Sequence, residues 1–275
     1  MNKRRDGKMT VFLFELKTYR WSLLWWAVGI IALQFIMMIF YPSMAQDAET
    51  IDLIIKHYPE ELLRAFGMSE QASLATVFGY YTFIFTFAQL LLSIQSAYYG
   101  FNFLSTEESN YTADFLYTKP LNRSRIIVEK QFAILCILVI TAMVTALSGL
   151  SAIELFRDGR PYEAENYWVL MGTIPVFQVF FFSIGMVVSA CTKKLKSVIG
   201  FALGVAFFFY IINGMRGIIG GDLLGYLTPY YHFEVAYILE EGMIPWNRGM
   251  ISIFVILLCH GMTYFYYPRK NLPTV

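Results

Sequence analysis

Six apolar stretches, each long enough to cross a lipid bilayer, constrain the fold of this chain more than any other feature. A helix needs roughly 20 predominantly apolar residues to cross a hydrocarbon core about 30 Å thick. The stretches lack Asp, Glu, Lys and Arg, and they cover residues 22–41, 74–101, 132–153, 167–190, 198–215 and 250–267. Runs such as FALGVAFFFYII do not alternate as the strands of a β-barrel do. We therefore predict an all-α polytopic membrane protein whose six transmembrane helices form one domain over residues 22–267.

The composition excludes several other classes of protein. Hydrophobic residues make up 57% of the chain and charged residues 15%, whereas soluble domains contain about 25% charged residues. A net charge of +1 leaves no concentrated basic face for nucleic acid. The 3 cysteines do not form the spaced pattern of a disulfide scaffold. The lipid bilayer, and no nucleic acid, is therefore the expected environment.

The distribution of Lys and Arg among the loops predicts the orientation. Of the 21 basic residues, 15 fall on the side of the N-terminus and six on the opposite side. The six are Lys56, Arg64, Arg157, Arg160, Arg216 and Arg248. Because cytoplasmic loops are enriched in Lys and Arg, both termini, including a tail at 268–275, are expected in the cytosol. The outer loops are then 42–73, 154–166 and 216–249, and the expected location is the cell membrane of a prokaryote.

Residues 1–21 are predicted to form a cytosolic N-terminus and an amphipathic helix in the inner membrane interface. Apolar side chains recur at helical spacing, while Glu15, Lys17, Thr18 and Arg20 face elsewhere. The apolar face of this interface helix includes Phe12, Leu13, Leu16 and Tyr19.

Neutral polar residues and small residues form stripes along three of the predicted spans. Gln89, Ser93 and Ser96 share one face of the second span. A second stripe on the third span consists of Thr141, Thr145 and Ser148. Both stripes fit interhelical hydrogen bonds or a substrate pathway, and we favour the hydrogen bonds. Gly200 and Gly204, in a Gly-x-x-x-Gly motif, allow close helix packing within one subunit or between two.

No residue pattern indicates catalysis, a cofactor or a metal site. The chain lacks the Gly-x-x-x-x-Gly-Lys-Ser/Thr loop that binds nucleotide phosphates, paired histidines on a helix, and Cys-x-x-Cys. A single imidazole, His260, lies within the spans and is expected to be a packing residue. The spans also lack the intramembrane charges that ion-driven carriers use.

The segment between the second and third spans, residues 102–130, is too elaborate for a passive linker. It contains a carboxylate pair, an apolar pair, a proline and a basic end. Since proline disfavours helix at the preceding residue, we expect two short helices meeting at Lys119 and Pro120. Mixed charge beside exposed apolar residues is typical of a docking surface, so a cytosolic coupling loop is predicted here. Its coupling residues are Glu107, Glu108, Thr112, Phe115, Leu116, Pro120, Arg123 and Lys130.

This pattern resembles the signature loop of the ABC-2 type permeases, the transmembrane subunits of a class of ABC transporters. The six spans, the interface helix and the segment Thr228–Phe233 after the fifth span extend the resemblance over the chain. The resemblance implies a permease that pairs with a second, identical or paralogous permease subunit. A separate ATP-binding subunit would carry ATP and Mg²⁺ and drive alternating access, with export as the expected direction.

Two other classes of function remain open from the residues alone. A self-sufficient secondary carrier or channel is disfavoured by the charge-free spans. An intramembrane enzyme is disfavoured more strongly, because no catalytic set is recognisable. The chain is therefore expected to be a transport subunit without an ATPase site of its own.

Overall fold

The computed structural model describes residues 10–47, 50, 53–54, 57–58, 63, 74–109, 123–192, 197–219 and 222–266. Its long helices are α1 (Thr10–Met38), α5 (Val77–Ser109), α7 (Arg123–Phe156), α8 (Ala164–Cys191), α9 (Val198–Ile219) and α13 (Trp246–Tyr266). The short helices are α2 (Tyr41–Gln46), α10 (Asp222–Gly225), α11 (Pro229–His232) and α12 (Val235–Glu241). The six long helices are apolar and long enough to cross a membrane, which confirms the predicted all-α polytopic fold.

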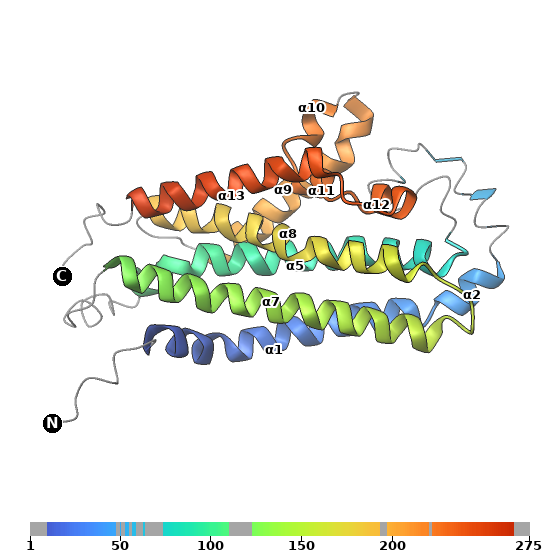
Figure 1. The fold of residues 1–275 in the computed structure, drawn as a ribbon, viewed down its shortest axis with the longest axis horizontal. Helices are drawn as coiled ribbons and strands as arrows, with labels where there is room; N and C mark the ends of the chain where they lie inside the picture. Colours follow the sequence, from blue (N-terminus) through green and yellow to red (C-terminus); the bar gives the residue numbers. More distant parts are fainter. Residues whose placement is uncertain are drawn as a thin grey trace.

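Apart from α9, which is inclined to the others, the long helices run roughly along one axis of the molecule (Figure 1). At one end, which we call the near end, α1 and α7 begin and α5 and α13 end. The opposite, far end holds α2 and α12 (Figure 1). An even number of long helices places the first and last helical residues at the same end.

The first helix differs from its prediction. Residues 10–21 are the first three turns of α1 and continue into the span without a break, instead of forming a separate interface helix. No proline interrupts α1, and its first glycine is Gly29. Glu15, predicted on the polar face, is buried against the neighbouring helix α7.

Two helix pairs form the core of the bundle: α1 packs mainly on α7, and α5 packs mainly on α8. Helices α9 and α13 lie against α5 and α8, respectively. Aromatic rings join α8 to α11, where Phe177 and Phe181 of α8 make edge-to-face contacts with each other and with Tyr230. The bundle therefore divides into an α1–α7 pair and a larger group built around α5 and α8.

Helices α5 and α8 cross at two glycines with almost no space between their backbones. A Cβ on Gly185 would lie 2.6 Å from the backbone nitrogen of Phe101 and 2.8 Å from the carbonyl oxygen of Ala97. A Cβ on Gly100 would collide with the carbonyl oxygen of Phe182. Only glycine at both positions permits this approach.

The segment between α9 and α13 folds back against the bundle. Thr228 caps α11 by accepting a hydrogen bond from the backbone N–H of Tyr230, and Pro229 occupies the first turn. The side chains of α11 are buried, and α12 packs on α5 and α8. The glycines Gly214 and Gly217 do not break α9, which continues to Ile219.

Candidate functional site

Both ends of the predicted coupling loop belong to long helices. Helix α5 extends to Ser109 and α7 begins at Arg123, so both flanks of the loop are helical and lie at the near end (Figure 1). Glu107 and Glu108 fall in the last turn of α5. Arg123 and Lys130 lie in the first turns of α7. The other predicted coupling residues, Thr112, Phe115, Leu116 and Pro120, lie outside the described residues.

Lys130, the last residue of the predicted loop, makes its contacts inside the chain. Its ammonium nitrogen lies 3.4 Å from Glu15 Oε1, and the two side chains are 3% and 8% exposed. The same nitrogen lies 5.6 Å from the ring centroid of Phe103 on α5. This ion pair therefore joins α1 to the first turns of α7 and leaves Lys130 little surface to offer a partner.

A carboxylate of α7 holds the start of α1. Glu129 Oε2 accepts a hydrogen bond from the backbone N–H of Val11 at 3.1 Å, and its Oε1 accepts one from Arg125 Nε at 2.8 Å. The first N–H groups of a helix have no partner within the helix, and its N-terminus favours negative charge. Glu129 satisfies both requirements from a neighbouring helix.

The predicted apolar face of residues 9–21 is divided between packing and exposure. Tyr19 is buried, and its hydroxyl accepts a hydrogen bond from Asn102 Nδ2 of α5 at 3.0 Å. Leu16 packs beside it, Phe12 is half-buried, and Leu13 is exposed. The start of α1 is therefore fastened to both helices that flank segment 110–122.

The polar stripe of α5 contacts the segment that folds back between α9 and α13. The Tyr230 hydroxyl donates to Ser93 Oγ at 2.7 Å, because the Ser93 hydroxyl itself donates to the carbonyl of Leu90. Gln89 Nε2 donates to the Phe233 carbonyl at 3.5 Å, and the Ser96 hydroxyl bonds within its own helix. All three stripe residues are buried. In this conformation they form packing contacts.

A buried polar chain joins α1, α7 and α8. Gln34 of α1 accepts a hydrogen bond from the Ser148 hydroxyl at 3.2 Å and donates to the Thr145 carbonyl at 3.3 Å. Gln178 of α8 donates to Thr141 Oγ1 at 3.5 Å. The second predicted stripe therefore hydrogen-bonds between helices, as interhelical packing in a membrane requires.

Gly200 and Gly204 do not bring two helices of this chain together. Both are exposed, no heavy atom lies within 4 Å of a Cβ placed on Gly204, and Ser197 is the neighbour of Gly200. Within the described part of the chain, the motif faces outward. Packing against a second subunit stays the open alternative.

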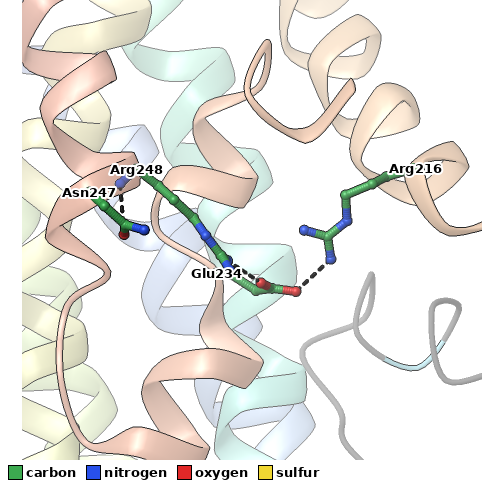
Figure 2. Close-up of polar contacts among 4 residues, drawn as sticks. All are labelled: Arg216, Glu234, Asn247 and Arg248. Carbon is green, nitrogen blue, oxygen red and sulfur yellow. Dashed lines mark hydrogen bonds and ion pairs between the residues drawn. The ribbon is translucent and has the colours of Figure 1, made fainter. Parts of the chain in front are cut away.

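A cluster of two arginines and one glutamate lies at the far end, and the sequence did not single it out. Figure 2 shows Arg216 of α9 and Arg248 of α13 converging on Glu234, which precedes α12. Arg216 Nη2 lies 2.6 Å from Glu234 Oε1, and Arg248 Nη1 lies 2.9 Å from Oε2. Both guanidinium carbons also lie over Tyr231, at 4.1 and 4.0 Å from its ring centroid. We call these four residues the far-end arginine cluster.

His232 lies next to this cluster and is neutral at pH 7. Nε2 lies 3.0 Å from the Tyr226 carbonyl, so it carries the proton, and Nδ1 accepts from the Ser252 hydroxyl at 2.7 Å. Burial lowers the pKa of His232 below its usual value, and the positive charge of Arg248 lowers it further. The hydrogen bond to the Tyr226 carbonyl opposes this shift only in part. The imidazole therefore adds no charge to the arginines.

The described residues contain no group of three or more His, Cys, Asp and Glu side chains that could hold a metal ion. His260, expected to be a packing residue, is half-buried on α13, with Nδ1 3.0 Å from the Ile256 carbonyl and 3.3 Å from Ser183 Oγ.

The structure is that of an α-helical polytopic membrane protein. Six of its helices are long and apolar enough to cross a membrane, polar side chains form hydrogen bonds between helices, and an ion pair joins α1 to α7. The profile of the ABC-2 family transporter proteins matches residues 9–272, nearly the whole chain. The chain therefore belongs to the ABC-2 family and is a membrane permease of an ABC transporter. Searches of curated proteins and of solved structures found no match.

Proposed function

We propose that this chain is the permease subunit of an ATP-driven exporter that works by alternating access. The observation that carries the proposal is the near-end network, in which Glu15 pairs with Lys130 and Glu129 binds the start of α1. These contacts tie α1 to the helix that immediately follows the coupling segment 110–122. A force applied to that segment reaches α1 and α7 together.

The proposed partners are a separate ABC ATP-binding subunit and a second permease subunit, identical or paralogous. The ATP-binding subunit carries ATP and Mg²⁺ and docks on the near end, where Glu107, Glu108 and Arg123 lie at the ends of the flanking helices. Lys130 acts in this scheme as an internal link between the docked segment and α1, because its charge is neutralised by Glu15.

The proposed orientation places the near end in the cytosol of a prokaryotic cell. Cysteine labelling in intact cells checks this proposal on a Cys191→Ser background. An impermeant maleimide should label Asp158→Cys, in the far turn between α7 and α8, but should label Ser124→Cys only after permeabilisation. Labelling of Ser124→Cys in intact cells contradicts the proposed orientation.

The docking proposal is tested with a triple variant: Glu108→Ala, Leu116→Ala and Arg123→Ala. We expect the variant to insert normally but to lose copurification with the ATP-binding subunit and to lose transport. The matched control combines Glu154→Ala and Arg157→Ala, which removes an ion pair of 2.8 Å from the far end. Normal copurification and transport by the triple variant refute docking at this segment. Transport by the purified chain without any ATPase favours a secondary carrier.

A further inference from the structure

The far-end arginine cluster holds more positive than negative charge. Two guanidinium groups share one carboxylate, and among the described residues Glu234 is the acid that pairs with them. The side chains are 12%, 19% and 4% exposed for Arg216, Arg248 and Glu234. Charges that are largely removed from water are normally matched by an equal number of opposite charges. Within the part of the chain that the structure describes, one positive charge of this cluster has no such match.

One nitrogen of the cluster also lacks a hydrogen-bond partner among the described residues. Arg216 Nη1 is buried and finds no acceptor there, although Nη2 of the same group is bound to Glu234. In Figure 2 the guanidinium of Arg216 points toward Glu234, whose carboxylate also contacts the guanidinium of Arg248. A buried donor without a partner is uncommon in folded proteins. An additional acceptor carrying negative charge would satisfy the nitrogen and the charge together.

The two guanidinium groups are fixed in position before any ligand arrives. Both lie over the ring of Tyr231, and Arg248 also lies 5.3 Å from the ring centroid of Tyr237. The Tyr231 ring is itself backed by Gly225, where a Cβ would lie 2.5 Å from Tyr231 Cδ1. A stacked guanidinium presents its donors in a fixed plane that matches the oxygens of phosphate and carboxylate.

An arginine elsewhere at the far end shows what a purely structural contact looks like. Arg157 bonds to Glu154 at 2.8 Å and lies 5.6 Å from the ring centroid of Tyr162. Its charge is matched one to one, and both side chains are substantially exposed. The far-end arginine cluster differs in its two-to-one charge ratio and in its burial.

We propose that Arg216 and Arg248, held over Tyr231 with Glu234 between them, bind an oxyanion group, a phosphate or a carboxylate. The group enters at the far end, where α9, the segment before α12, and α13 meet. It belongs either to a soluble anion or to the headgroup of an anionic lipid. Binding at this site does not depend on the partner ATPase, so its test is separate from the test of the proposed function.

The first measurement is thermal unfolding of the full chain in phosphatidylcholine nanodiscs, titrated with sodium phosphate at constant ionic strength. We expect a saturable rise in Tm for the wild type. Arg216→Gln and Arg248→Gln should each raise the half-saturating phosphate concentration about tenfold or more, since each removes a charge-assisted hydrogen bond. Glu234→Gln should lower it several-fold, because it removes the competing carboxylate.

The source of the anion is decided by a second set of nanodiscs that contain phosphatidic acid. Stabilisation by phosphatidic acid that is lost in the arginine variants identifies a lipid headgroup, whereas a response to phosphate alone identifies a soluble anion. Arg157→Gln and Glu154→Gln are the matched controls and should respond as the wild type does.

Three results overturn the proposal. The first is a wild type that responds to neither phosphate nor phosphatidic acid. The second is an arginine variant whose response equals that of Arg157→Gln. The third is a Glu234→Gln variant that binds phosphate no more tightly than the wild type. If the arginine variants do not fold, the phosphate titration of Glu234→Gln tests the proposal by itself, because a purely structural carboxylate would not compete with the anion.

Discussion

Replacing Gly185 with alanine should force α8 away from α5. The new Cβ would lie 2.6 Å from the nitrogen of Phe101 and 2.8 Å from the oxygen of Ala97. Carbon contacts are normally about 3.5–4.0 Å, so the helices must separate locally by about 1 Å. Both neighbours are backbone atoms, and no side-chain rotation relieves the contact. Overpacking of this kind costs about 1–3 kcal/mol.

Gly172→Ala on the same helix is the control, because no heavy atom lies within 4 Å of a Cβ at that position. Alanine there should stabilise the helix by up to about 1 kcal/mol. Because Gly185→Ala gains the same helix propensity, the free energies of unfolding of the two variants should differ by the overpacking cost, about 1–3 kcal/mol. Unfolding by sodium dodecyl sulfate in mixed micelles, followed by tryptophan fluorescence, measures this difference.

The reasoning is refuted if Gly185→Ala is as stable as Gly172→Ala. The double variant Gly100→Ala and Gly185→Ala adds a second criterion. Because the two glycines face each other across one crossing, separation caused by the first methyl group relieves part of the second clash. The double variant should therefore be less unstable than the sum of the single variants.

Three further predictions concern the polar contacts. Lys130→Met should lower the free energy of unfolding by about 3–5 kcal/mol, because it leaves Glu15 charged and buried. Adding Glu15→Leu should recover most of that loss in the same micelle assay, and equal instability of the single and double variants would argue against the pair. The pKa of His232 is lowered, so its contribution to stability is complete above about pH 6.5 and decreases on acidification. His232→Asn should flatten this dependence of Tm on pH, and an unchanged pH profile would contradict the assignment. Tyr230→Phe and Ser93→Ala should each cost about 0.5–1.5 kcal/mol, and a double-mutant cycle should show coupling between them.

The spans were predictable from sequence because the signal is local. Twenty apolar residues in a row must lie in a bilayer or a core, whatever they contact. The predicted span 167–190 agrees with α8 (Ala164–Cys191) to within three residues at either end. The turns that begin at Arg123 were expected as a short helix of the coupling loop and not as the start of α7, because polar turns resemble loops in composition.

The near-end contacts were not predictable, because each joins residues distant in the chain. Glu15 was placed on a polar face by its charge, whereas its burial depends on Lys130 of another helix. The Gly-x-x-x-Gly motif at Gly200 suggested close packing, but the close crossing of α5 and α8 uses two single glycines on separate helices. A motif within one helix cannot reveal which surface a second helix covers.

The far-end arginine cluster was missed for a different reason. Arg216 and Arg248 were counted as loop charges that report orientation, which treats each charge as exposed and independent. Their convergence on Glu234 requires the turn that precedes α12. The available signal was weak: a carboxylate within an aromatic segment, Tyr-Tyr-His-Phe-Glu, flanked by single arginines.

The crossing at Gly100 divides α5 into two arms of unequal length. At 1.5 Å per residue, the arm from Gly100 to Ser109 measures about 14 Å, and the arm from Gly100 to Val77 about 35 Å. If the crossing is a fixed pivot, a tilt that displaces the coupling end by 1 Å moves the far end by about 2.5 Å. Pairs of spin labels at the two ends of α5 would measure this ratio between nucleotide-free and nucleotide-bound complexes. Equal displacements at both ends would instead indicate sliding of the whole helix. With a fixed pivot, the position of the two glycines along α5 and α8 sets the ratio between the movements of the two ends of the bundle.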